Sequence, residues 1–181
     1  MPDASGVLAV VGVDPGARWS AGVLRAGDAA LWGWTVGPHD HEGRPVAIAD
    51  PDDLAAVSAY ADRVAEMVER TIRYAEKARH QRIRIAIEEV RTPIGWQYGR
   101  RTRITLADWL TPRCVAMAIR GAWPDARWVP AARHGQRDRM AYPIELQRSR
   151  PPSWPPNEAR RGERDHERAA FDIAGVGATL P

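Results

Sequence analysis

The chain has 181 residues, of which 44% are hydrophobic and 27% charged, which fits one globular domain and excludes a disordered or low-complexity chain. Its single cysteine, Cys114, excludes an internal disulfide and favours a reducing, cytoplasmic compartment. No stretch approaches the roughly 18 apolar residues of a bilayer span, so we expect no membrane partner; the formal net charge of +3 hints only weakly at a polyanionic one.

The first predicted elements are three strands. Residues 7–13 (VLAVVGV) are apolar on both faces, which is typical of a central strand. Residues 18–25 and 30–36 are two further strand candidates. The links between the three are too short for anything but hairpins, so we predict a three-stranded antiparallel meander.

The middle of the chain alternates helix and strand. Residues 38–50 form a polar loop, and residues 52–79 carry apolar side chains at helical spacing, with Asp50 or Asp52 as the candidate cap. Residues 83–90 (IRIAIEEV) predict a fourth strand. Because a helix separates it from the third strand, it can return to the sheet in parallel.

A second helix is predicted at residues 105–122, with a kink or restart at Thr111-Pro112. Residues 126–131 predict a fifth strand, residues 132–156 a loop rich in arginine and proline, and residues 158–179 a last helix. The order indicates an α/β domain over residues 1–181. Its five-stranded mixed sheet, a meander followed by two parallel strands, is flanked by helices, as in the ribonuclease H-like arrangement.

Three acids stand at notable positions in these elements. Asp14 ends the first strand, Glu88 (followed by Glu89) ends the fourth, and Asp172 interrupts an apolar stretch of the last helix. We expect Asp14, Glu88 and Asp172 to converge, and such carboxylates suit Mg²⁺, or Mn²⁺ in its place. Two such ions about 4 Å apart can drive phosphodiester hydrolysis. Each acid alone also has an ordinary interpretation: a turn, a solvated strand end, or an ion pair with Arg168.

The segments VVGVDPGARWSAGV, IAIEEV, RCVAMAIRGAW and HERAAFDIAG together resemble the RuvC family of Holliday-junction resolvases, and look closest to the forms of phages that infect actinobacteria. The resemblance implies a homodimeric, Mg²⁺-dependent endodeoxyribonuclease of DNA recombination and repair, which nicks four-way junctions. It implies Asp14, Glu88 and Asp172 as catalytic metal ligands. For a phage protein, it implies the cytoplasm of the host cell.

The last helix departs from the family pattern, which has two acids one turn apart, often with a histidine in place of the first. One turn before Asp172 the chain has Arg168 and Ala169. We therefore take Asp165 as the first candidate for a further metal ligand, with His166 or Glu167 as alternatives. Arg168 is a candidate contact for the scissile phosphate.

Two arginine-rich segments are candidate nucleic-acid contacts, because arginine binds phosphate with paired hydrogen bonds and aromatic rings stack on bases. The first follows the fourth strand, and the second, which also holds His134, follows the fifth. The candidate residues are Arg91, Trp96, Tyr98, Arg100, Arg101 and Arg103 in the first segment, and Arg133 and Arg137 in the second.

Two other hypotheses remain open on the sequence. One is a different nuclease of the same fold that acts on flaps, forks or RNA–DNA hybrids, or a YqgF-like processing factor. The other is a non-catalytic DNA-binding module whose metal site has decayed, as the missing acid pair in the last helix would suggest.

Overall fold

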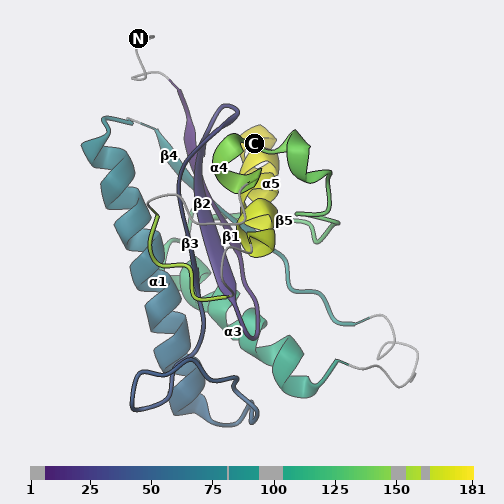
Figure 1. The fold of residues 1–181 in the computed structure, drawn as a ribbon. Helices are drawn as coiled ribbons and strands as arrows, with labels where there is room; N and C mark the ends of the chain where they lie inside the picture. The colour runs from purple at the N-terminus through teal and green to yellow at the C-terminus, as the bar shows by residue number, and fades with distance from the viewer. Residues whose placement is uncertain (1–6, 81, 94–103, 148–153, 160–163) are drawn as a thin grey trace.

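A computed structural model of the chain describes residues 7–80, 82–93, 104–147, 154–159 and 164–181. Its centre is a five-stranded mixed sheet with the strand order β3-β2-β1-β4-β5 (Figure 1). The strands are β1 (Ala9–Asp14), β2 (Ser20–Ala26), β3 (Ala29–Val36), β4 (Ile83–Glu88) and β5 (Arg127–Val129). The predicted α/β class, strand number and mixed sheet are confirmed.

The strand directions also agree with the sequence. β1 pairs with β2, and β2 with β3, in antiparallel, which is the expected meander. β4 pairs with β1 in parallel and β5 pairs with β4 in parallel. The carboxyl ends of β1, β4 and β5 therefore lie at the same edge of the sheet, which is where open α/β sheets usually build their sites.

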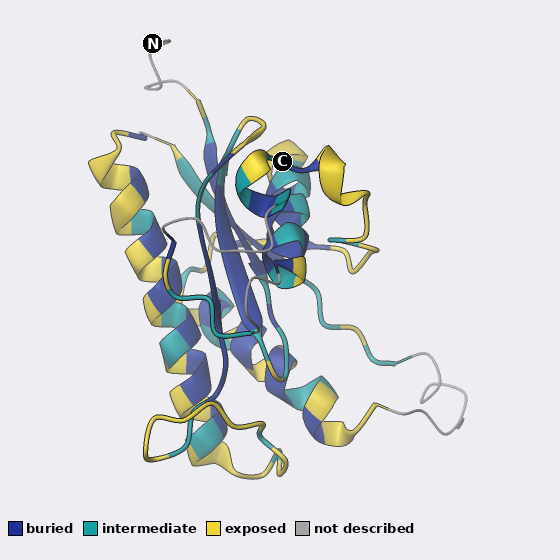
Figure 2. Ribbon diagram, viewed as in Figure 1, coloured by how far each residue is buried: buried dark blue, intermediate teal, exposed yellow. Residues whose placement is uncertain are grey.

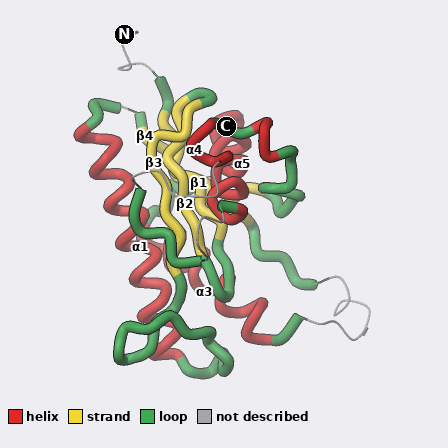
Figure 3. Tube along the Cα trace, in the orientation of Figure 1, coloured by secondary structure: helices red, strands yellow, loops and turns green. Residues whose placement is uncertain are grey.

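Helices cover both faces of this sheet, as the tube view makes clear (Figure 3). On one face lie α1 (Leu54–Lys77) and α3 (Leu106–Ala122), and on the other α5 (Asp165–Thr179), with the short α4 (Ile144–Gln147) and the 3-10 turn η2 (Arg139–Ala141) beside it. Figure 2 shows that the buried residues of α1 lie on the side of the helix that faces the sheet. None of the helices in the described ranges is long and apolar enough to cross a bilayer.

Alternation along β1 divides the core between the two faces. Val11 and Val13 belong to the apolar cluster that includes α1 and α3, whereas Val10 packs with Ile173 of α5. Val10, Val11 and Val13 are all fully buried, which is why this strand reads as a continuous apolar run.

The α5 helix lies unusually close to the sheet. A Cβ built on Gly12 of β1 would lie 2.0 Å from the carbonyl oxygen of Ala170 and 2.6 Å from the amide nitrogen of Ala174. On the helix itself, a Cβ on Gly177 would lie 2.3 Å from the Cβ of Ala86 in β4. Gly12 thus allows the backbones of strand and helix to touch, and Gly177 makes room for the side chain of Ala86.

Most element ends lie within two residues of the predictions, and larger differences concern the cap of α1, the continuity of α3 and the start of α5. The cap of α1 is Asp53, which accepts a hydrogen bond from the amide of Ala56, and not Asp50 or Asp52. α3 does not restart at Thr111-Pro112: one helix begins after Thr105, which forms a capping box with Asp108, and Pro112 lies inside it.

The last helix begins at Asp165 and not at residue 158. The chain before it runs beside β3 instead, where Thr35 donates a hydrogen bond to the carbonyl of Pro156 and accepts one from the amide of Glu158. Backbone groups used in this way are not free to form a helical turn. The loop predicted at 132–156 also contains η2 and α4.

Candidate functional site

Asp14 and Glu88 end two neighbouring parallel strands at the same level. Val13 is aligned with Ile87 in the β1–β4 register, so the next residue on each strand is one of the two acids. Neighbouring strands lie about 4.8 Å apart, which makes the two carboxylates close neighbours. The parallel pairing alone therefore brings together two acids that are 74 positions apart in the sequence.

A cavity of about 370 Å³ opens at this edge of the sheet. It is bounded by the strand ends, by the segment after β5 and by the first turn of α5. Its lining residues are Asp14, Glu88, Ala132, His134, Gly135, Gln136, Asp165, His166 and Ala169. Acidic and imidazole groups from four parts of the chain, β1, β4, the segment after β5 and α5, therefore share one concave space.

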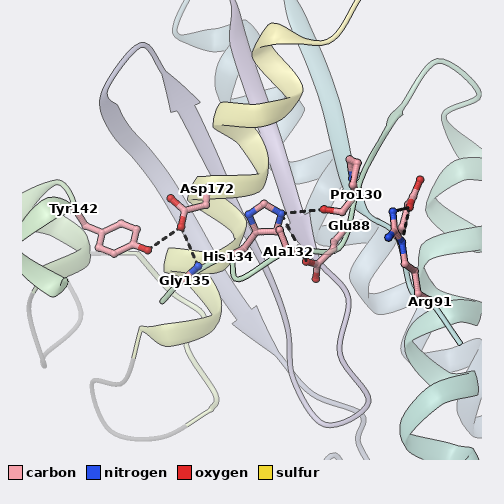
Figure 4. A network of polar contacts seen from close by, with 9 residues as sticks. Glu88, Arg91, Pro130, Ala132, His134, Gly135, Tyr142 and Asp172 are labelled. Atoms are coloured by element: carbon pink, nitrogen blue, oxygen red, sulfur yellow. Dashed lines mark hydrogen bonds and ion pairs between the residues drawn. The ribbon is translucent and has the colours of Figure 1, made fainter. Parts of the chain in front are cut away.

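Two histidines contact the strand-end acids. Nδ1 of His166 lies 3.4 Å from Oδ2 of Asp14. Nε2 of His134 lies 3.8 Å from Oε1 of Glu88 and 3.2 Å from the carbonyl oxygen of Pro130 (Figure 4). Glu88 also accepts a long hydrogen bond, 3.4 Å, from the amide of Ala132. Each carboxylate thus has an imidazole neighbour.

Glu88 holds its proton more tightly than an ordinary glutamate. Burial, and then the negative charge of Asp14, raise its pKa from 4.5 to about 7, although His134 acts in the opposite direction. A carboxyl group whose pKa is raised by burial and a neighbouring charge is a recognised sign of a functional site. A cation placed between the two acids would remove the repulsion.

We expect this carboxyl group to make stability depend on pH. The folded pKa of Glu88 lies above its ordinary value, so protonation of Glu88 stabilises the folded state. This stabilisation is fully present below about pH 4.5 and is lost as the pH rises through about 7. In buffer with EDTA, Glu88→Gln should melt at a higher temperature than wild type at about pH 8, and the difference should shrink towards pH 5.

The measurement is thermal unfolding at several pH values. The matched control is Glu89→Gln: Glu89 is paired with Arg91 outside the cavity lining, so its variant should follow the wild-type curve. Wild-type and Glu88→Gln curves that stay parallel from pH 5 to pH 8 would contradict the prediction.

The acids predicted for the last helix occupy different surroundings. Asp165 and His166, the first two residues of α5, line the cavity, and Ala169 follows one turn later. The side chain of Asp165 is 68% exposed and forms an ion pair with Arg168.

Asp172, expected at the same centre, does not line this cavity. Its carboxylate accepts hydrogen bonds from the amide of Gly135 (2.9 Å) and the hydroxyl of Tyr142 (2.8 Å), as Figure 4 shows. It also forms an ion pair with Arg137. Of the three carboxylates predicted to converge, the cavity therefore gathers Asp14 and Glu88, and the third acid in its lining is Asp165.

Glu167, an alternative metal ligand on the sequence, faces the protein interior. Its side chain and that of Arg164 are both 0% exposed and form an ion pair. The side-chain amide of Asn157 donates to it at 3.4 Å, and the Arg164 guanidinium lies 5.6 Å from the ring centre of Trp154. Glu167 is thus paired with its own neighbours and is not a candidate metal ligand in the cavity.

The predicted nucleic-acid contacts are only partly described. Trp96, Tyr98, Arg100, Arg101 and Arg103 lie outside the described residues.

Among the described ones, Arg91 is exposed and paired with Glu89, and Arg133 is exposed. Arg137 is paired with Asp172, and Arg168 donates to the carbonyl of Leu146 at 2.9 Å. Arg133 lies within the cavity-lining segment 132–136 and Arg137 directly follows it, although neither is itself among the lining residues.

Sequence reasoning treated His134 only as part of a basic segment. The signal that would have found it is the strand order: β5 is parallel to β4, so the segment after β5 must begin beside Glu88. Gln136 and Ala169 carry no sequence signal for a site. Among the described residues no group of three or more His, Cys, Asp or Glu side chains is already arranged to hold a metal ion.

No protein-family model matches the chain, and no curated protein matches it.

Proposed function

We propose that the chain is a divalent-metal-dependent endonuclease with a ribonuclease H-like fold, which cuts branched DNA and has the four-way junction as its substrate. The observation that carries the proposal is the shared cavity at the carboxyl ends of β1 and β4, where Asp14 and Glu88 meet the first turn of α5. The resemblance to junction resolvases adds the substrate class, a homodimer and a cytoplasmic location.

The donor set of the cavity fits Mg²⁺ or Mn²⁺. Asp14, Glu88 and Asp165 offer carboxylate oxygens, the ligands that these ions prefer, and His166 adds an imidazole nitrogen that Mn²⁺ also accepts. Burial, and then the negative charge of Asp14, raise the pKa of Glu88, and a bound cation would act against both effects. Asp165 would have to exchange its ion pair with Arg168 for the metal.

In this proposal Asp14 and Glu88 are the principal ligands, because strand ends fix both side chains. A bound ion of this kind supplies an activated water and stabilises the charge on a phosphodiester oxygen. Arg133 and Arg91, both exposed, would bind phosphates near the acidic centre, since Arg133 lies between two cavity-lining residues in the chain and Arg91 follows Glu88 by three positions. His134 and His166 border the space that a scissile phosphate would enter.

We expect Mg²⁺-dependent cleavage of a synthetic four-way junction and little cleavage of linear duplex of the same sequence. The test compares junction, flap, fork and RNA–DNA hybrid substrates at equal concentration, with and without EDTA. Symmetric nicks in opposed strands of the junction support the proposal. A clear preference for the hybrid or the flap would overturn the junction assignment and leave a different nuclease of the same fold.

A second candidate function is a non-catalytic DNA-binding module. The observation that favours it is Ala169, which puts a methyl group in the cavity wall one turn after His166. Thermal unfolding with increasing Mg²⁺ or Mn²⁺ separates the two. A nuclease site should be stabilised by the ions, since ligand binding to the folded state raises its stability, whereas junction binding without stabilisation or cleavage would favour the module.

A further inference from the structure

Asp172 is surrounded by hydrogen-bond donors from one segment of the chain. Its side chain is only 12% exposed, and its partners are the Gly135 amide, the Tyr142 hydroxyl and the Arg137 guanidinium. All three belong to the stretch between β5 and α4, as Figure 4 shows for Gly135 and Tyr142. A carboxylate has about four lone-pair positions, so most of the acceptor capacity of Asp172 is used within the protein.

The segment that Asp172 holds forms one wall of the acidic cavity. Ala132, His134, Gly135 and Gln136 line that wall. Gly135 has a φ of +78°, and a Cβ there would lie 3.0 Å from both the Ala169 amide nitrogen and the Asp165 carbonyl oxygen. The segment therefore rests directly on the first turns of α5, in a conformation that suits glycine.

The negative charge of Asp172 is compensated by an ion pair with an arginine, whereas the neighbours of Asp14 and Glu88 are histidines. Arg137 pairs with it and also stacks on the ring of Tyr142, with Cζ 4.3 Å from the ring centre. The Tyr142 ring meets Phe171 edge-on, with ring centres 6.2 Å apart. Asp172 is thus the centre of a packed polar cluster on the side of α5 that faces η2 and α4.

We propose that Asp172 is a positioning residue, which fastens the segment 132–142 to α5 and thereby holds His134 in the wall of the cavity. It does not bind the metal ion of the proposed nuclease, the function on which this inference rests. His134 is the residue through which the effect reaches the acids, since it adjoins Gly135 in the chain and lies 3.8 Å from Glu88.

The first arm of the test measures Mn²⁺ binding to the full chain without DNA, by electron paramagnetic resonance. We expect Asp172→Asn to bind Mn²⁺ within about twofold of wild type, and Asp14→Asn at least about tenfold more weakly. Loss of Mn²⁺ binding in Asp172→Asn to the same extent as in Asp14→Asn would overturn the inference.

The second arm does not depend on metal or activity. Hydrogen exchange should become faster at residues 132–142 in Asp172→Asn and in Tyr142→Phe, because each removes a contact of the cluster, and should stay unchanged there in Asp14→Asn. Unchanged exchange in Asp172→Asn would overturn the inference. If wild type neither binds Mn²⁺ nor cuts DNA, the proposed function fails, and this arm still decides whether Asp172 holds the segment.

The third arm separates positioning from general loss of structure. Asp172→Asn should lower kcat on the junction about tenfold while the Mg²⁺ concentration at half-maximal rate stays unchanged. The double variant with His134→Ala should cut no more slowly than His134→Ala alone, because both changes act through one side chain. If the two changes lower kcat additively, or if Asp172→Asn shifts the Mg²⁺ concentration at half-maximal rate, Asp172 does not act through His134 and the inference is overturned.

Discussion

Replacement of Asp14 by asparagine is expected to abolish junction cleavage and to leave junction binding intact. The change removes one negative charge from the pair of strand-end acids and keeps the side-chain shape. Metal ions contribute several kcal/mol of charge stabilisation in such reactions, so the rate should fall about a thousandfold. Binding should persist, because phosphates are bound by cations and not by this carboxylate.

The measurement pairs a cleavage time course with a gel-shift titration in Ca²⁺ or EDTA. The matched control is Asp62→Asn, the same chemical change at an exposed position of α1, outside the cavity lining; it should cut at the wild-type rate. An Asp14→Asn protein that cuts the junction at the wild-type rate would contradict the assignment of Asp14 to the active site. One that fails to bind the junction would point to a folding defect, which a melting curve detects.

Replacement of Glu167 by glutamine is expected to cause the largest loss of stability among single changes in α5. Arg164 would remain charged and fully buried without its carboxylate partner. Breaking a buried ion pair from one side typically costs about 3–5 kcal/mol. For a chain of this length the loss corresponds to a fall in melting temperature of about 10 °C.

Two comparisons make this prediction specific. Glu69→Gln breaks an exposed pair with Arg73 in α1, where a loss under about 1 kcal/mol is expected. The double variant Arg164→Met with Glu167→Leu removes both buried charges and should recover most of the stability. A Glu167→Gln protein as stable as Glu69→Gln would show that the buried pair contributes little.

The sequence was sufficient for the sheet and for two of the site acids. Continuous apolar runs that end in Asp14 and Glu88 predict buried strands with acids at their ends, and the intervening helix predicts parallel return. Strand pairing then brings the two acids together without reference to side-chain detail. These features depend on short-range patterns, which is why they could be predicted.

The part of the site on α5 could not be predicted in the same way. Asp172 looked like a ligand because a charge in an apolar stretch needs a partner, and its partners, Gly135, Arg137 and Tyr142, are 30 to 37 residues away. Glu167 was an alternative metal ligand on the sequence, yet it is buried in an ion pair with Arg164. Helical periodicity alone does not say which neighbouring element each face meets.

The close contact at Gly12 and Gly177 has a consequence for how the protein could accommodate a bound molecule. No side chain of the strand separates α5 from β1 at Gly12, so the helix has little room to move towards the sheet at that point. Asp14, Glu88 and the first turn of α5 therefore form a stiff frame of fixed depth. Any adjustment to the shape of a substrate must come from the wall between β5 and α4, which is attached to that frame by side chains.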